Sequence, residues 1–207
     1  MGGRVGARAG AALAKLQPMT MPASLSRPKP LVAFAAVLGL AIIILLAHGR
    51  PPICTCGTVA LWGSVGPAQS QMIADWYSAS HIVHGFLFHA ALHLAAPRWP
   101  IERRFLVAML VEAAWEIVEN TPLIIDRYRE ATIALGYTGD SILNSASDIS
   151  MMAIGFLAAR KLPLWASVVL VALLEVVPLL VIRDNLTLNV WMLLAPNDAL
   201  RAWQAGA

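Results

Sequence analysis

The sequence has little charge. Asp, Glu, Lys and Arg make up only 13% of its 207 residues, whereas a soluble domain carries about 25%. Hydrophobic residues make up 58%, and no stretch of soluble composition is longer than about 30 residues, well short of an ordinary domain. This composition is typical of an integral membrane protein and leaves no room for a separate aqueous catalytic domain.

Cysteine is scarce as well. The only two, Cys54 and Cys56, are separated by a single residue, and this spacing predicts a badly strained disulfide. We therefore expect no disulfide that holds the fold together. Two interpretations remain open for the pair: a redox or metal role, and two small residues in a loop.

Common catalytic motifs are missing. The sequence has no G-x-S-x-G, no H-E-x-x-H, no P-loop and no G-x-G-x-x-G, so nothing favours a serine hydrolase, a zincin or a nucleotide enzyme. The lack of E-x-x-H argues against a ferritin-like di-iron bundle. The 15 Lys and Arg residues are spread over short loops, which argues against a nucleic-acid partner.

Long apolar runs dominate the chain. The predicted membrane spans are residues 31–47, 79–96, 105–120, 140–159 and 164–182. A further run, residues 186–194, is too short to cross a bilayer and is expected to lie at its interface. The sequence therefore predicts an all-α integral membrane helical bundle of about five transmembrane helices plus a C-terminal interfacial helix.

The first residues differ from the rest. Residues 1–30 contain five Lys and Arg and no acid, so we expect a basic, flexible cytoplasmic tail before a single transmembrane domain over residues 31–207. The protein could start at Met1, Met19 or Met21. Ten Lys and Arg lie in this tail and in the loops after the second and fourth spans, against four in the opposite loops. The positive-inside rule then places the N-terminus in the cytoplasm.

Ionisable side chains lie inside the predicted spans, where each charge costs about 3 kcal/mol. Together with the neutral amide Asn144, those in three of the spans are His81, His84, His89, His93, Glu112, Glu116, Glu119, Asp140 and Asp148. At about 100° per residue, the three glutamates share one stripe of a helix, and the residues of the fourth span share another. The first two histidines point to a different sector from the last two, so not all four can face one centre.

The helical rise places His, Glu and Asp or Asn in matching layers of the outer half of the membrane. We expect a polar site there, centred on His84, Glu116, Asn144 and Asp148. His, Glu and Asp are ligands of zinc, manganese and non-haem iron, and the predicted cofactor is such a divalent ion. The predicted metal ligands are His81, His84, Glu112, Glu116, Glu119, Asp140 and Asp148, and the predicted catalytic residues are Glu116, Asp148 and Asn144.

Three functions remain open for this site. A bound metal could activate water against an ester, amide or phosphate of a lipid-linked substrate. The carboxylates could instead relay protons or bind a small cation in a transporter. Polar groups facing inward could also hold the bundle together by hydrogen bonds between helices. Outside the centre, His93 is expected to pack near the inner interface, and Glu175 to cap backbone groups freed by Pro178.

Four motifs suggest a family. They are Asp-Trp-Tyr-Ser-Ala-Ser-His-Ile-Val-His-Gly at 75–85, Glu-Ala-Ala-Trp-Glu-Ile-Val-Glu-Asn-Thr-Pro at 112–122, Gly-Asp-Ser-Ile-Leu-Asn-Ser-Ala-Ser-Asp at 139–148 and Arg-Asp-Asn-Leu-Thr-Leu-Asn at 183–189. With them, residues 30–200 resemble an uncharacterised family of bacterial multi-pass inner-membrane proteins. The resemblance implies an inner-membrane location among membrane lipids, and no activity. A weaker similarity, to small VanZ-like membrane proteins, covers the acidic span and the Asp and Asn helix but not the histidine helix.

Overall fold

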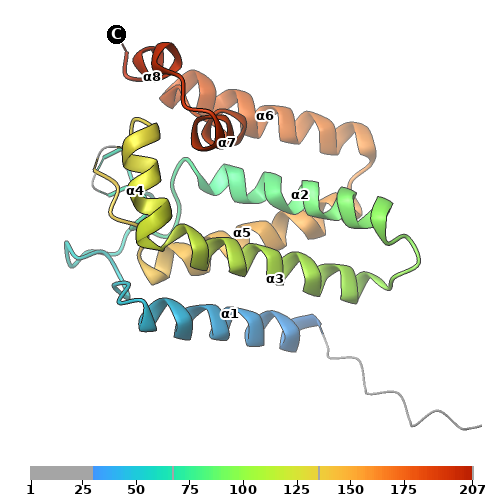
Figure 1. Ribbon diagram of the computed structural model, residues 1–207. Coiled ribbons are helices and arrows are strands. Elements are labelled where there is room, and N and C mark those ends of the chain that lie inside the picture. Colours follow the sequence, from blue (N-terminus) through green and yellow to red (C-terminus); the bar gives the residue numbers. More distant parts are fainter. Residues whose placement is uncertain (1–29, 67, 135, 207) are drawn as a thin grey trace, which may run out of the picture.

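The computed structural model of the protein describes residues 30–66, 68–134 and 136–206 (Figure 1). The helices are α1 (Pro30–Ala47), α2 (Ser78–Ala95), α3 (Ile101–Glu119), α4 (Pro122–Ala131), α5 (Ile142–Lys161), α6 (Leu164–Ile182), α7 (Leu186–Leu194) and α8 (Asp198–Gln204). No strand forms within the described ranges, so the predicted all-helical class is confirmed. The predicted basic tail lies outside the described residues, except for its last residue, Pro30.

Three helices, α1, α5 and α6, are long and apolar enough to cross a membrane. The helices α2 and α3 have similar lengths, 18 and 19 residues, but they carry the histidines and glutamates that make them less apolar. The predicted count of five spans therefore stays a prediction. In Figure 1 these five long helices lie side by side, with α4 across one end and α7 and α8 beside α6.

The helices α2 and α5 pack with their backbones in close contact, because each contributes a glycine at the crossing. An ideal Cβ on Gly85 would lie 2.2 Å from the carbonyl oxygen of Met152, and one on Gly155 would lie 2.1 Å from the carbonyl oxygen of Ile82. Small residues allow this approach between helices that lipid surrounds. The crossing brings the polar residues of α2 and α5 together.

A buried apolar core fills the half of the bundle where α3 begins and α5 ends. Its centre consists of Ala108, Met109, Met152 and Phe156, each 0% exposed. Glu112, Glu116 and Glu119 of α3 and Asp148 of α5 come from the other halves of these two helices. The core therefore closes one end of the bundle and leaves the polar residues at the other.

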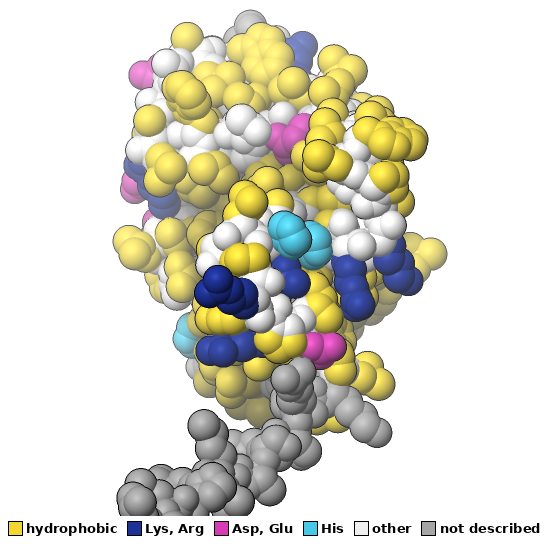
Figure 2. Space-filling view, turned by 90° about the vertical axis from the view of Figure 1, so that its right-hand side faces the viewer, with side chains coloured by type: hydrophobic (Ala, Val, Ile, Leu, Met, Phe, Trp, Pro, Cys, Tyr) yellow, Lys and Arg dark blue, Asp and Glu magenta, His cyan; other side chains and the backbone are white. Residues whose placement is uncertain are grey.

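Basic side chains gather at the closed end of the bundle, where α2 and α5 end and α3 begins (Figure 2). The guanidinium carbon of Arg103 lies 3.9 Å from the centroid of a Trp99 ring. Arg104 Nη1 donates to Nδ1 of the exposed His93 over 3.1 Å. His93 is thus separate from the polar cluster, as the spacing predicted, and it makes a polar contact at the surface.

The loop before α2 completes the first turn of α5. The backbone N–H of Ile142 donates to the carbonyl of Pro51 over 2.9 Å, and that of Leu143 donates to the carbonyl of Pro52 over 3.1 Å. The next N–H, of Asn144, donates to Ser141 Oγ over 3.2 Å. The N–H groups that a helix start leaves without helical partners are therefore satisfied by the loop and the cap.

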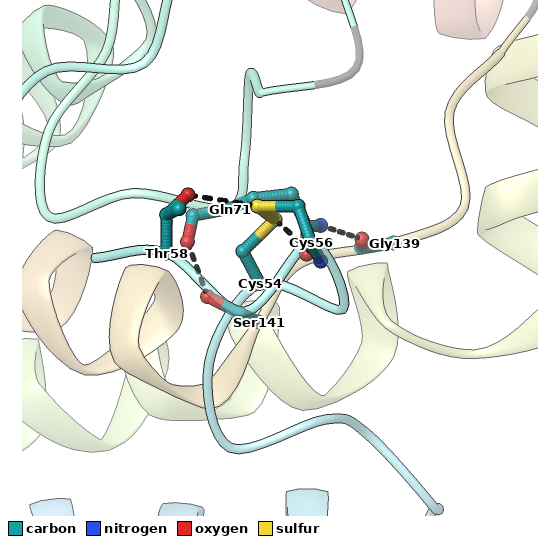
Figure 3. Close-up of a disulfide and its surroundings, with 6 residues drawn as sticks. All are labelled: Cys54, Cys56, Thr58, Gln71, Gly139 and Ser141. Atoms are coloured by element: carbon teal, nitrogen blue, oxygen red, sulfur yellow. Dashed lines mark hydrogen bonds between the residues drawn. A yellow bond between two sulfur atoms is a disulfide. The ribbon is translucent and has the colours of Figure 1, made fainter. Parts of the chain in front are cut away.

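The same loop contains a disulfide between residues two positions apart, which closes a small ring within the loop and links no two helices. Cys54 and Cys56 are bonded, with their Cα atoms 5.1 Å apart (Figure 3). This Cα separation lies in the ordinary range for disulfides. A tight turn makes it possible, because the N–H of Gly57 donates to the carbonyl of Cys54 over 2.9 Å and Gly57 has a φ of 76°. Positive φ is a conformation that glycine adopts without strain.

Glu175 on α6 caps a different helix from the one expected. Its carboxylate accepts from the N–H groups of Leu186 and Thr187 over 3.2 and 3.1 Å, and from Thr187 Oγ1 over 2.6 Å. These groups belong to the start of α7, so Glu175 holds α7 against α6. It does not serve the backbone groups that Pro178 frees.

Asp184, between α6 and α7, is a buried acid that ties this region to α2. It accepts from Tyr77 OH over 2.7 Å and from Gln204 Nε2 over 3.1 Å. Burial raises the pKa of its carboxyl above the ordinary 3.8. The Asp184 carboxyl therefore holds its proton more tightly in the folded chain than in the unfolded one.

Replacing Asp184 with asparagine is expected to flatten the pH dependence of stability. With a raised pKa, the contribution of Asp184 to the free energy of unfolding is fully present below pH 3.8 and is lost as the pH rises through the folded value. Thermal midpoints in detergent between about pH 3 and pH 7 check this. The wild-type midpoint falls relative to that of Asp184→Asn as the pH rises, and parallel curves would contradict the assignment.

Candidate functional site

Four buried polar side chains from three helices meet in the half of the bundle opposite the apolar core. His81 comes from α2, Glu112 and Glu116 from α3, and Asp148 from α5, and none is more than 7% exposed. The glutamates share one side of α3 because they are four residues apart. The glycine crossing of α2 and α5 brings His81 and Asp148 to the same place.

His81 lies at the centre of this group. Its Nδ1 is 2.6 Å from Glu112 Oε1 and 3.4 Å from Glu116 Oε1, and its Nε2 is 3.8 Å from Asp148 Oδ2. A carboxylate only accepts hydrogen bonds, so the bond to Glu112 places a proton on Nδ1. In the neutral ring, Nε2 then carries a free lone pair. This is how an acid orients a histidine that binds a metal.

Glu112 serves a second histidine as well. His84 Nδ1 lies 3.0 Å from Glu112 Oε2 and 3.2 Å from Glu112 Oε1. Glu112 itself is 0% exposed. One carboxylate therefore fixes the orientation of both imidazole rings, whose planes meet edge to face with centroids 5.3 Å apart.

Glu116 is the least satisfied polar residue of the cluster. It is 1% exposed, and neither of its carboxylate oxygens has a hydrogen-bond partner among the described residues. Burying a carboxylate without a partner is costly, and proteins pair such groups with cations or metals. Both oxygens of Glu116 are thus available to a ligand that the surrounding side chains do not supply.

Two further acids, Asp140 and Asp148, are held by neutral donors. Asp140, just before α5, accepts from Asn120 Nδ2 over 2.8 Å and from Tyr137 OH over 2.9 Å. Asp148 accepts from Ser78 Oγ over 3.1 Å. Bonds of this kind orient carboxylate ligands in metal sites and leave lone pairs free for the ion.

Three overlapping groups in the described part of the chain could hold a metal ion, because one ligand atom of each member lies within 4.8 Å of the others. They are His81 with His84 and Glu112, His81 with Glu116 and Asp148, and Glu116 with Glu119 and Asp140. All seven predicted metal ligands thus fall into connected groups. Imidazole and carboxylate ligands fit the predicted class of ion, zinc, manganese or iron.

Asn144, which was predicted for the centre, and His89, which was not, have contacts of other kinds. Asn144 is 1% exposed, and its Nδ2 donates to the carbonyl of Met72 over 3.0 Å. It thereby holds the loop before α2. His89 packs edge-on against Phe156 with centroids 5.1 Å apart. The separation of the two histidine pairs, which the spacing predicted, is therefore confirmed.

Sequence reasoning missed the residues that hold the acids. Ser78, Asn120 and Tyr137 lie outside the predicted set, yet each donates to an acid of the cluster. Ser78 and Asn120 do lie inside the motifs quoted above, and Asn120 directly follows Glu119. Tyr137 precedes Asp140 by three residues in a turn, a relation that helical periodicity does not reveal.

Comparisons with known proteins agree with the resemblance of the four motifs. The model of a family described as "Protein of unknown function (DUF2585)" matches residues 45–206. A UPF0314 protein of Sphingopyxis alaskensis is 52% identical over 188 residues, which cover 90% of this chain and 100% of that protein. A UPF0314 protein of Paracoccus denitrificans is 53% identical over 181 residues, covering 86% and 94%.

No solved structure is significantly similar to the chain. The comparisons do not show the weaker similarity to VanZ-like proteins. The family match spans all eight helices except most of α1, and it includes every residue of the polar cluster. The chain belongs to the DUF2585 family of proteins of unknown function.

Proposed function

We propose that the protein is an inner-membrane protein of five spans that binds a divalent metal at His81, Glu116 and Asp148 and hydrolyses a lipid-linked ester, amide or phosphate. The observation that carries the proposal is Glu116, a fully buried carboxylate with no hydrogen-bond partner among the described residues. A cation in contact with Glu116 would offset the cost of burying it.

The surrounding residues fit a catalytic metal better than a closed structural one. The three proposed protein ligands would leave one coordination position of the ion for water, as in catalytic zinc sites. Structural zinc sites use four protein ligands instead. A metal ion supplies a water of lowered pKa as the nucleophile. Glu112 orients His81 and Ser78 orients Asp148, and we propose that a carboxylate oxygen of Glu116 or Asp148 that does not bind the ion accepts the proton of the attacking water.

The outer surface of the bundle supports a lipid setting. Large apolar side chains are exposed along α1 and α6, among them Leu31 at 76%, Leu164 at 81% and Leu180 at 76%. Exposed apolar surface on this scale is covered by lipid or by a partner. A site enclosed by helices of this kind is reached more readily by a substrate that carries a lipid chain.

Ion or proton transport is the second candidate, and the apolar core argues against it. A transport path has to continue through the bundle, with polar side chains or water along it. Between the cluster and the end of the bundle where α3 begins and α5 ends lie Met109, Met152 and Phe156, each 0% exposed. The polar groups thus end against buried apolar side chains, which favours a bound ion over a conducted one.

Elemental analysis of the detergent-purified protein tests the proposal. We expect about one or more zinc, manganese or iron ions per wild-type chain, and a folded Glu116→Gln variant with strongly reduced metal. Glu130→Gln, which changes an exposed glutamate on α4, is the matched control and keeps its metal. A wild-type protein that stays free of metal after growth with all three ions would overturn the proposal.

Hydrolysis is tested separately. The metal-loaded protein is mixed with phosphatidylglycerol vesicles, and ³¹P NMR follows the release of phosphate monoesters. Turnover by the wild type and Glu130→Gln, but not by Glu116→Gln, is the expected result. Metal binding without turnover on lipid esters, amides and phosphates would reduce the site to a structural one.

A further inference from the structure

The three ligand groups are not independent, because they share residues in a fixed order. His81 belongs to the first and second groups, and Glu116 belongs to the second and third. A single ion at His81, Glu116 and Asp148 leaves Glu119 and Asp140 without a role in metal binding. The geometry therefore raises the question of what the third group binds.

Glu116 belongs to both the second and the third ligand group. Both Oε1 and Oε2 are buried and have no hydrogen-bond partner among the described residues. Oε1 lies 3.4 Å from Nδ1 of His81, and Glu116 also supplies a ligand atom to the group with Glu119 and Asp140. A carboxylate with two unpartnered oxygens between two ligand groups has the position of a bridge between two ions.

We infer that the protein binds two metal ions, with Glu116 bridging a first site at His81 and Asp148 and a second site at Glu119 and Asp140. The inference rests on the metal site proposed above and adds a second ion to it. Two-metal sites position and polarise both the attacking water and the leaving oxygen of a phosphate or acyl group.

The two sites differ in the chemistry of their ligands. The first contains an imidazole, which suits zinc and iron, whereas the second has carboxylates alone, which suit manganese and magnesium. Asn120 and Tyr137 already fix the Asp140 carboxylate through its two oxygens, so the second site is held in place before an ion arrives. Zinc is thus expected to prefer the first site, and manganese can fill both.

Manganese titration of the metal-free wild-type protein in detergent, followed by electron paramagnetic resonance, tests this inference. We expect about two equivalents of bound Mn²⁺ with the signal of a spin-coupled pair, and displacement of one equivalent by Zn²⁺. Asp140→Asn is expected to bind one uncoupled equivalent. Asp126→Asn, at an acid whose side chain is 63% exposed on α4, is the matched control and binds two.

Glu119→Gln provides a second test should Asp140→Asn fail to fold, because Glu119 is only partly buried. One equivalent in the wild type, unchanged in Asp140→Asn and lost in Glu116→Gln, would overturn the second ion and leave the proposed function standing. Two equivalents that persist in both Asp140→Asn and Glu119→Gln would also overturn it. No bound manganese, zinc or iron in the wild type would overturn both proposals.

Discussion

Gly155→Ala is expected to lower the thermal unfolding midpoint by about 10 °C, which corresponds to about 3 kcal/mol for a chain of this size. The added methyl group would lie 2.1 Å from the carbonyl oxygen of Ile82. That oxygen belongs to the backbone of α2, so no rotation of a side chain relieves the clash, and the two helices have to move apart. Because His81 and Asp148 come from these helices, the metal site is expected to loosen as well.

Gly39→Ala is the matched control for this prediction. Gly39 also lies inside a helix, α1, but an added Cβ there would have nothing within 4 Å. Alanine forms helix better than glycine by about 1 kcal/mol, so this variant is expected to be as stable as the wild type or slightly more so. Thermal unfolding followed by circular dichroism compares the three proteins. Equal losses in both variants would show that the α2–α5 crossing is not specially sensitive.

His81→Gln is expected to lower the affinity for the proposed metal ion by more than about 100-fold, which is the upper limit for losing a residue that only orients a ligand. His81 is the one histidine shared by two of the ligand groups, and it approaches Glu112, Glu116 and Asp148. Glutamine keeps a polar side chain of similar length but lacks the ring nitrogen that binds the ion. Competition against a chelator of known affinity measures the change.

Two further histidine variants make this prediction specific. His84→Gln is expected to have a smaller effect, because His84 belongs to a single ligand group and contacts Glu112 alone among the acids. His93→Gln changes an exposed histidine at the far end of α2 and is expected to leave the affinity unaltered. Similar losses in all three variants would indicate a general effect on folding and would contradict a metal centred on His81.

The long helices were predictable because a long apolar run indicates a segment that can be buried or face lipid as a helix. α6 and α7 begin and end at the predicted residues, and α1 and α2 do so within one residue. α3 begins at Ile101, four residues earlier than predicted, because Glu102, Arg103 and Arg104 interrupted the apolar run without ending the helix. Charge in the first turn of a helix is compatible with its continuation.

Two of the short helices, α4 and α8, were missed. They have 10 and 7 residues and contain six charged residues between them, so they give no apolar run. α4 instead has the Pro122 start that is typical of a first helical turn. Its stability depends on packing against α7, for example through Tyr128 OH, which donates to Asn189 Oδ1 over 3.1 Å. Contacts this distant in the sequence leave no local signal.

The site was predictable in its members and less so in its centre. Helical spacing correctly grouped Glu112 with Glu116 and separated His81 from His89, since those relations are local. It also favoured Asn144 because Asn144 lies one turn before Asp148. Asn144 also donates to the carbonyl of Met72 in the loop before α2. Loop positions follow from long-range hydrogen bonds, so periodicity alone could not predict this contact.

The loop that completes the start of α5 also sets an order for biosynthesis. Arg50, at the beginning of this loop, donates through Nε to the carbonyl of Asp140, 90 residues further along the chain. The ribosome therefore synthesises this loop well before α5, the helix whose start the loop completes. A nascent chain halted before Ile142 would already contain Arg50, Pro51 and Pro52. The carbonyls of Pro51 and Pro52 could not yet accept from the N–H groups of Ile142 and Leu143. The last acids of the cluster can reach their final positions only when α5 emerges and meets this earlier segment.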